Sequence, residues 1–146
     1  MRIRQARFED LEGITEVRTA VAENHLSIEE MAERGITRER IIHDLTARKL
    51  RGWVAEEAGR IVAFSMAYAE DGKVFALFTL PGFEGRGFGS LLLDEALAWL
   101  KSLGHERAWL STGRSTRAQT FYERRGWMIE GHDPDDPQDI VLTKPL

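Results

Sequence analysis

Three glycines stand at alternate positions, Gly85, Gly87 and Gly89, where a long amphipathic helix should begin. A helix N-terminus carries unpaired backbone N–H groups and a partial positive charge. Because glycine has no side chain, a bulky anion can approach such a backbone closely, and successive N–H groups then form an anion-binding nest. The pattern therefore predicts a site for a phosphate or diphosphate group.

Two common phosphate-binding loops do not fit these glycines. A P-loop needs Gly-Lys followed by Ser or Thr, and no lysine follows any of the three. A dinucleotide-binding fingerprint needs a third small residue, but a count from Gly87 puts Leu92 there. A count from Gly85 reaches Ser90, and no strand ending in an acidic residue follows at the expected distance. Taken alone, so short a glycine-rich segment is equally well a flexible turn before a helix.

The frame that remains resembles the acyl-CoA loop of the GNAT acetyltransferase superfamily, whose pattern is Gln/Arg-x-x-Gly-x-Gly/Ala. Residues 84–89 read Glu-Gly-Arg-Gly-Phe-Gly. Glu84 stands where the family has Gln or Arg, but the backbone part of the cradle does not depend on that side chain. The resemblance implies acetyl-CoA as co-substrate and no metal. It also implies cofactor contacts from the preceding strand, the loop and the first helical turn: Phe78, Thr79, Leu80, Gly85, Arg86, Gly87, Phe88, Gly89 and Ser90.

A second segment strengthens the resemblance. Residues 115–127 read Ser-Thr-Arg-Ala-Gln-Thr-Phe-Tyr-Glu-Arg-Arg-Gly-Trp, close to the family's Asn-x-x-Ala-x-x-Phe-Tyr-x-x-x-Gly-Phe. Ser115 replaces the family's Asn, and a serine can still hydrogen-bond at a helix start. Ala118 and Tyr122 are four residues apart and share a helical face, whereas Phe121 points about 100° away. The resemblance implies that Ser115, Ala118 and Tyr122 contact the cofactor.

The resemblance further implies that Tyr122 donates a proton to the departing CoA thiolate. Reference pKa values of about 10 for a phenol and about 8.5 for a thiol make this transfer uphill by roughly 2 kcal/mol, which is feasible when the thiolate is held close. The alternative is a tyrosine that only packs on the cofactor or orients its sulfur.

The acceptor amine needs a base. An alkylamine with a pKa of about 10.4 is almost wholly protonated at neutral pH, and its deprotonation costs roughly 4.6 kcal/mol. A base, a water relay or a substrate of low pKa must supply the difference. Strand 74–80 contains no Asp, Glu or His, where many relatives place a base. The resemblance leaves Glu23 and His25 as candidate bases and Asn24 beside them as an acceptor contact, because this loop lines the acceptor site in the fold. A solvated helix end and a surface histidine are the alternative interpretations.

Charged residues near the second segment indicate further ligand contacts. Four arginines flank the expected exit of the cofactor: Arg114, Arg117, Arg124 and Arg125. Arg114 or Arg117 is placed to meet the 3′-phosphate of CoA, although exposed arginines on a polar helix face are the default. The aspartate-rich stretch 133–139 could attract a cationic acceptor, although such a run is usually a solvated turn.

Size and composition narrow the class of protein. A chain of 146 residues is most economically one domain, spanning 1–146, with a core that needs no disulfide. The sequence has no cysteine, hence no thiolate nucleophile, and its net charge of -4 argues against nucleic-acid binding. The longest apolar run, 61–69, is too short to span a bilayer, so we expect no membrane partner and a cytoplasmic protein.

Periodicity and turn residues predict the elements that position these groups. In chain order they are a strand at 3–6, a helix from 10 to about 22, a loop or short helix at 23–27, a helix from Thr37 to about 50, strands at 53–56, 61–68 and 74–80, a helix from the glycine loop to 103, a strand at 107–111, a helix at 116–125, and strands at 127–130 and 140–144. Turns are expected at Ala58-Gly59 and Asp71-Gly72, and Gly104 should end the long helix. One face of that helix should pack on the sheet through Leu92, Ala96, Trp99 and Leu103.

This order is the one expected for the GNAT fold and spans essentially the whole chain. The resemblance implies an α/β (α+β) fold with a mixed, mostly antiparallel seven-stranded sheet, flanked by about four helices and splayed between the fourth and fifth strands. In that fold the pantetheine arm enters the splay and pairs with the main chain of the fourth strand, as an added strand pairs with a sheet edge.

We therefore expect an acyltransferase that moves an acetyl group from acetyl-CoA to a primary amine by direct attack in a ternary complex. The absence of cysteine fits direct transfer, while a Ser or Thr acyl-enzyme stays open. One alternative is a noncatalytic CoA-binding or regulatory module of the same fold. Another is an enzyme that acetylates a protein or peptide N-terminus rather than a small amine. Homodimers are common in the family, but no segment here marks an interface.

Overall fold

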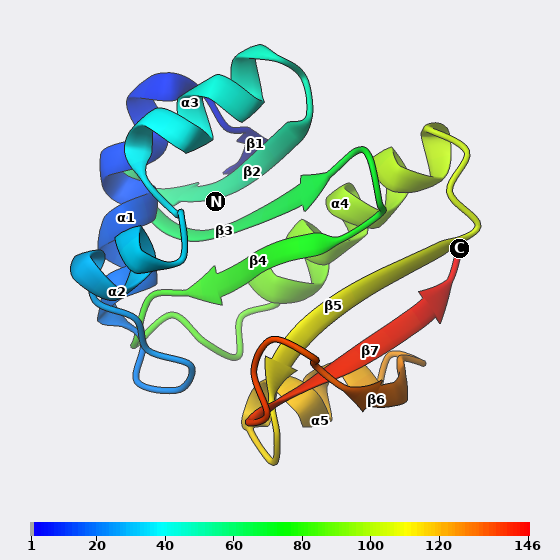
Figure 1. The fold of residues 1–146 in the computed structure, drawn as a ribbon. Coiled ribbons are helices and arrows are strands. Elements are labelled where there is room, and N and C mark those ends of the chain that lie inside the picture. Colours follow the sequence, from blue (N-terminus) through cyan, green and yellow to red (C-terminus); the bar gives the residue numbers. More distant parts are fainter. Residues whose placement is uncertain (1) are drawn as a thin grey trace.

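The computed structural model of the chain describes residues 2–146. Within them, seven strands and five α-helices form an α+β fold, with a 3₁₀ turn at Phe8–Asp10 (Figure 1). The elements follow in this order: β1 Arg2–Gln5, α1 Leu11–Ala20, α2 Ile28–Glu33, α3 Arg38–Thr46, β2 Leu50–Glu57, β3 Arg60–Tyr68, β4 Val74–Thr79, α4 Phe88–Ser102, β5 Arg107–Gly113, α5 Arg117–Glu123, β6 Met128–His132 and β7 Asp139–Pro145. The predicted fold class and strand number are confirmed. The helix beyond the predicted four is α2, which begins just after segment 23–27.

The strands form two antiparallel sheets that meet at one point. The first has the order β1-β2-β3-β4 and the second the order β5-β7-β6. A single parallel bridge between Lys73 and Trp109 joins them at the start of β4. Beyond that bridge, β4 and β5 run in the same direction and diverge (Figure 1), which confirms the predicted splay.

Short turns fix the pairing of β2, β3 and β4 where the sequence predicted them. Ala58 and Gly59 both have positive φ, 51° and 77°, as a tight hairpin turn requires. Gly72 has a φ of 75°, and the preceding Asp71 carboxylate accepts a hydrogen bond from the Lys73 backbone N–H at 3.2 Å. These local signals set the register that leads into β4.

Hydroxyl side chains cap three of the helices. Ser27, Thr37 and Thr116 each accept a hydrogen bond from a backbone N–H of the first turn, of α2, α3 and α5 respectively. The cap of α3 was predicted. At α5, Thr116 supplies the capping hydroxyl, while Ser115 takes a left-handed φ of 61° and donates its backbone N–H to the Gln119 side chain.

The predicted extent of α3 to about residue 50 is wrong. The helix ends at Thr46, and Leu50 already pairs with Tyr68 as the first residue of β2. Arg48 adopts a φ of 59°, a left-handed conformation that a helix does not continue through. Tertiary pairing of a buried leucine therefore overrides the local helical pattern.

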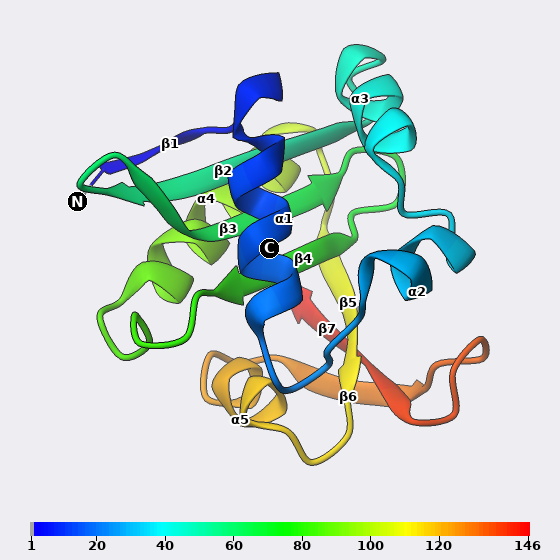
Figure 2. The same cartoon turned by 90° about the vertical axis from the view of Figure 1, so that its left-hand side faces the viewer.

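Helices cover both faces of the first sheet. Helix α1 crosses β2, β3 and β4 on one face, and α4 lies on the other (Figure 2). The buried residues of α4 are Phe88, Leu92, Leu93, Ala96 and Leu100. Leu103, predicted to pack on the sheet, is 49% exposed because the helix ends at Ser102 and the i, i+4 ridge of Leu92 and Ala96 continues to Leu100 instead. Among residues 2–146, no helix has both the length and the apolar character needed to cross a bilayer.

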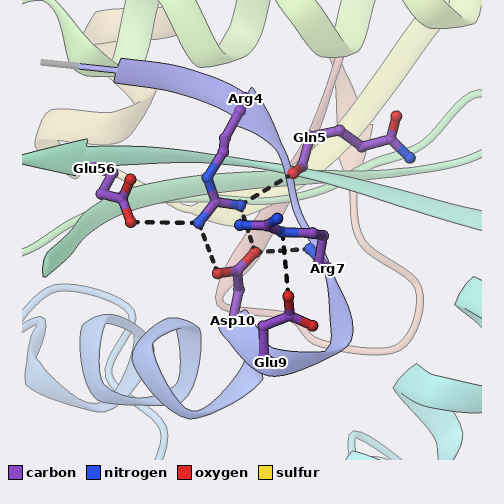
Figure 3. Close-up of polar contacts among 6 residues, drawn as sticks. All are labelled: Arg4, Gln5, Arg7, Glu9, Asp10 and Glu56. Atoms are coloured by element: carbon purple, nitrogen blue, oxygen red, sulfur yellow. Dashed lines mark hydrogen bonds and ion pairs between the residues drawn. The ribbon is translucent and has the colours of Figure 1, made fainter. Parts of the chain in front are cut away.

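A buried ion pair joins β1 to the start of α1 (Figure 3). The Arg4 guanidinium donates to both carboxylate oxygens of Asp10, at 2.7 and 2.9 Å, and the Arg7 backbone N–H donates to the same carboxylate at 2.7 Å. Glu56 of β2 lies 3.5 Å from the second guanidinium nitrogen of Arg4. The hydrogen bonds from Arg4, together with that from Arg7, hold the pKa of Asp10 below its usual value.

We predict that Asp10→Asn lowers the free energy of unfolding by about 2 kcal/mol at neutral pH, because Arg4 is left buried without its partner. The carboxylate with a lowered pKa stabilises the fold above the unfolded pKa of about 4, so the difference from the native protein should vanish as the pH falls through the folded pKa.

Urea unfolding at several pH values measures this difference. Glu9→Gln is the matched control, since Glu9 forms an exposed ion pair with Arg7 in the same turn and should change stability by less than about 0.5 kcal/mol. Equal losses from the two substitutions would contradict the account.

Candidate functional site

A large cleft opens where β4 and β5 diverge. Its cavity volume is about 1210 Å³. Residues of α1, α2 and the loop between them line one side, residues 74–78 and 110–112 line it from β4 and β5, and residues of the loop 133–139 line it from the second sheet. Ala118 and Tyr122 reach the same cavity from α5. The cleft therefore joins segments that are far apart in the sequence.

The edge of β4 that faces the cleft has no strand partner. In the described chain, β4 pairs only with β3, and the bridge at Lys73 precedes it. On the β3 side, Phe78 and Thr79 pair with Phe64 and Ala63, and the Leu80 N–H donates to the Val62 carbonyl at 2.7 Å. An unpaired strand edge beside a cavity offers main-chain donors and acceptors to an extended ligand that carries amide groups.

The glycine loop between β4 and α4 has the backbone of an anion cradle. Gly85 and Gly87 have positive φ values of 76° and 86°, and nothing lies within 4 Å of a Cβ atom placed on either. Gly87 is the N-cap of α4 and provides no side-chain cap, so the first amides of the helix are free for a ligand. Arg86 turns its guanidinium toward Glu57, with a nitrogen–oxygen distance of 2.8 Å. The loop thus fits a diphosphate through its main chain.

Glu84 is bound within the loop. Its carboxylate accepts a hydrogen bond from the Gly82 backbone N–H. Hydrogen bonds from the backbone amides of residues 82–84, its own first among them, lower the pKa of Glu84. The carboxylate therefore stays ionised on the amides that precede Gly85, and the amides from Gly85 onward are not occupied by it.

Arg125 is the arginine that the structure brings to the first turn of α4. Its guanidinium donates to the Ser90 hydroxyl and lies over the Phe121 ring, 3.7 Å from the centroid. The Phe121 ring is also the nearest neighbour of Gly89, since a Cβ there would meet it at 3.5 Å. The segment that follows α5 thereby places a positive charge beside the glycine loop. By contrast, Arg114 contacts His132 and the Pro137 carbonyl.

Tyr122 is both a core residue and part of the cleft. Its side chain packs against Trp127 and Phe121, with ring centroids 5.5 and 5.3 Å away. Burial raises the pKa of Tyr122 above its ordinary value. A phenol in this position remains protonated at physiological pH and is available as a hydrogen-bond or proton donor.

The predicted acceptor-side residues separate in the structure. His25 and Asn24 line the cleft, but Glu23 does not. Both carboxylate oxygens of Glu23 accept the Arg117 backbone N–H, at 3.1 and 3.3 Å, so Glu23 ties the loop to the start of α5. The Asn24 side chain accepts the Gly113 backbone N–H at 3.2 Å and thus fixes the same loop to β5.

His25 keeps one ring nitrogen free. Its Nδ1 lies 2.9 Å from the Val21 carbonyl oxygen. Because a carbonyl oxygen only accepts, Nδ1 must carry the hydrogen, and Nε2 of the neutral ring is left as the acceptor.

Carboxylates gather on the opposite side of the cleft. Asp133, Asp135, Asp136 and Asp139 all line it. Burial, followed by the negative charges of Asp136 and Asp133, raises the pKa of Asp139. Arg34 of α2 reaches across to Asp136, with a nitrogen–oxygen distance of 3.6 Å. This side of the cleft favours a cationic ligand. No cluster of His and acidic residues within 2–146 could hold a metal ion.

Sequence reasoning missed Arg18 of α1, which lines the cleft and lies over the Phe78 ring, 4.1 Å from its centroid. Its position among the apolar residues of an amphipathic helix gave no signal, because arginine on a helix is normally solvated. The contact of Arg125 with Ser90 joins residues 35 apart and likewise has no local signature.

Comparison with known families identifies a match over most of the chain. The model of the acetyltransferase (GNAT) family matches residues 11–127. An uncharacterised N-acetyltransferase of Mycobacterium tuberculosis is 30% identical over 116 residues, covering 77% of this chain and 73% of that protein. The mycothiol acetyltransferase of Propionibacterium freudenreichii is 30% identical over 148 residues, covering 91% of this chain and 45% of that protein. The ribosomal protein bS18-alanine N-acetyltransferase of Haemophilus influenzae is 32% identical over 73 residues, 49% of this chain and 50% of that protein.

Solved structures share the fold. The PaiA N-acetyltransferase from Thermoplasma acidophilum, in complex with coenzyme A, has a TM-score of 0.80 and 20% identity, and the similarity covers 100% of both chains. At this identity the likeness establishes the fold.

We predict that neither tyrosine ionises in the folded protein below about pH 11. Burial raises the pKa of Tyr122, and burial together with the Asp44 carboxylate raises the pKa of Tyr68 to about 12. The phenolate absorbance of the native protein should therefore stay flat where the unfolded protein titrates, near about pH 10. The stability that these neutral phenols contribute is lost as the pH rises above that value. A native phenol that titrates near its ordinary pKa would contradict the burial assigned to Tyr122.

Proposed function

Because this chain belongs to the GNAT family of acetyl-CoA-dependent N-acetyltransferases, we propose that it acetylates a primary amine by direct attack in a ternary complex. The cleft between β4 and β5 is the observation that supports this most. One cavity contains the open edge of β4, the Tyr122 side chain and the acidic residues of loop 133–139. The acyl donor, the proton-donating phenol and the acceptor amine can therefore occupy the same cavity.

Acetyl-CoA is proposed to bind along β4 and the glycine loop. The amides from Gly85 to Ser90 would hold the diphosphate, and the Arg125 guanidinium would add a fixed positive charge beside it. Main-chain groups of Phe78, Thr79 and Leu80 on the edge that points away from β3 would pair with the amides of the pantetheine arm, while the Leu80 N–H stays on the Val62 carbonyl. When bound, acetyl-CoA supplies the acetyl group as an activated thioester.

Tyr122 is proposed to donate its phenolic proton to the departing sulfur. Its raised pKa keeps the phenol protonated in the resting enzyme and makes the transfer more uphill than the reference pKa values imply, so the sulfur must be held in hydrogen-bond contact with the phenol. Tyr122 also lines the cleft that would hold the thioester.

His25 is proposed as the base that accepts the proton of the acceptor ammonium. Its Nε2 is free because Nδ1–H is donated to Val21, and the side chain lines the cleft. Glu23, the other candidate, has both oxygens on the Arg117 amide and lies outside the cleft lining, which favours His25. Because the chain has no cysteine, a thiolate acyl-enzyme is excluded, and direct attack is the simpler route.

The acidic residues of loop 133–139 favour an acceptor that carries positive charge. A small amine is the first candidate, and the mycothiol acetyltransferase similarity is consistent with a small acceptor. The bS18-alanine N-acetyltransferase similarity supports a second candidate, a peptide N-terminus. Thiol release from acetyl-CoA, measured with a panel of small amines and with alanine-initiated peptides, separates the two.

We predict that Tyr122→Phe lowers kcat about 100-fold, because the sulfur then leaves without a proton donor. CoA affinity, measured by calorimetry, should change less than about twofold, since the loop amides are untouched. A variant that turns over at the native rate would show that Tyr122 only packs in the site.

We predict that Asp135→Asn combined with Asp139→Asn raises KM for an aliphatic diamine about threefold more than for the monoamine of equal length, because the second ammonium loses its partners. Glu130→Gln is the control, since Glu130 is an exposed β6 carboxylate paired with Arg107. The same KM change for diamine and monoamine would remove loop 133–139 from acceptor recognition.

A further inference from the structure

Arg18 is a cation in the wall of the cleft. It projects from α1, and its Nη2 donates to the Asn24 backbone carbonyl at 2.9 Å. Its guanidinium lies over the ring of Phe78, a residue of β4 that lines the cleft. Arg18 therefore lies between the acceptor-side loop and the strand proposed to carry the acyl donor.

No carboxylate neutralises this guanidinium. Within residues 2–146, every ion pair of the structure involves other cations, and Arg18 has no acidic group within 4.0 Å. Its Nη1 is buried and has no hydrogen-bond partner. Arg4 of β1 differs, because Asp10 lies on two of its guanidinium nitrogens and Glu56 beside them, so that only its Nε is without a partner (Figure 3).

A partly buried guanidinium with one buried nitrogen left without a partner is costly unless a ligand supplies that partner. Buried polar groups are nearly always hydrogen-bonded, and buried charges are nearly always paired. Burial and the like charge of Arg34 lower the pKa of Arg18 to about 10, so the guanidinium remains charged at neutral pH. Arg34 itself is paired with Asp136, and among the cations that line the cleft in residues 2–146 Arg18 is the one with a buried side-chain nitrogen that has no partner.

We propose that Arg18 binds a carboxylate of the acceptor, so that the preferred acceptors are amines that also carry a carboxylate, such as amino acids. This inference rests on the proposed function, since it assumes that the acceptor occupies the cleft. A planar guanidinium matches the two oxygens of a carboxylate. Only one hydrogen bond and one ring contact hold the long side chain, so it can turn Nη1 toward a ligand. The acidic residues of loop 133–139 would attract the ammonium of the same molecule.

The test compares acceptors that differ only in the carboxylate. L-lysine and 1,5-diaminopentane form one pair, and L-phenylalanine and 2-phenylethylamine form another. The kcat/KM ratio within each pair is measured for the native enzyme, Arg18→Met and Arg18→Lys. Methionine keeps the length and the contact with Phe78 without the charge, and lysine restores the charge without the planar fork. Arg60→Met is the matched control. Arg60 of β3 pairs with Glu16 of α1, the helix that carries Arg18, and neither Arg60 nor Glu16 lines the cleft.

The native enzyme should favour the carboxylate-bearing member of a pair. Arg18→Met should reduce that preference about 10- to 100-fold, Arg18→Lys should restore part of it, and Arg60→Met should leave it unchanged. CoA affinity should stay the same in all variants. An equal preference in native and Arg18→Met enzymes, or a native preference for the decarboxylated amine, would overturn the proposal and give Arg18 only a packing role.

Two further arms separate this inference from the proposed function. If no amine is acetylated although CoA binds, the proposal that the protein acetylates an amine fails. Calorimetry of L-lysine binding to the CoA complex then decides whether Arg18 binds a carboxylate. Binding that Arg18→Met abolishes supports the carboxylate site, and binding that it leaves unchanged rejects it. If Arg18→Met instead alters the preference for succinyl-CoA over acetyl-CoA, the carboxylate belongs to the acyl group and the assignment to the acceptor is wrong.

Discussion

The divergence of β4 from β5 is the constraint on which the rest of the structure depends. Within residues 2–146, the bridge between Lys73, just before β4, and Trp109 of β5 joins the two sheets, and β4 is not paired with β5 beyond it. A sheet that stayed paired would satisfy the edge of β4 internally and leave no space for a ligand. The separation leaves main-chain donors and acceptors free on one strand and opens the cavity that Tyr122, His25 and the acidic loop share.

Both sheets must be held rigidly for such a gap to persist. Helix α4 buries an apolar ridge against the first sheet, and the buried Ser65 hydroxyl of β3 donates to the Leu92 carbonyl at 3.0 Å. Helix α5 covers the second sheet with Tyr122 packed on Trp127. The same two helices present the glycine loop and Arg125 at their ends, so the packing that keeps the sheets apart also positions the groups proposed to bind phosphate.

Local chemistry made much of this fold predictable. Gly72, Gly87 and Thr37 adopt the turn, loop and cap conformations that their residue types favour, and two sequence motifs sufficed to identify the family. The errors at Leu50 and Leu103 arose where strand pairing or the end of a helix overrode a periodic pattern. The acceptor side was harder, because the hold of Glu23 on Arg117 and the burial of Arg18 depend on contacts between distant segments. Side-chain chemistry alone cannot reveal which carboxylate is already occupied or which cation lacks a partner.

The most direct test of the account is a crystal structure of this protein with acetyl-CoA. We expect the diphosphate on the backbone amides from Gly85 to Ser90, the pantetheine arm along Phe78, Thr79 and Leu80, and the thioester sulfur within hydrogen-bond reach of the Tyr122 hydroxyl. A ligand bound elsewhere, or a β4 edge that pairs with β5 and closes the cleft, would contradict the central claim that the splayed strands form the acetyl-transfer site.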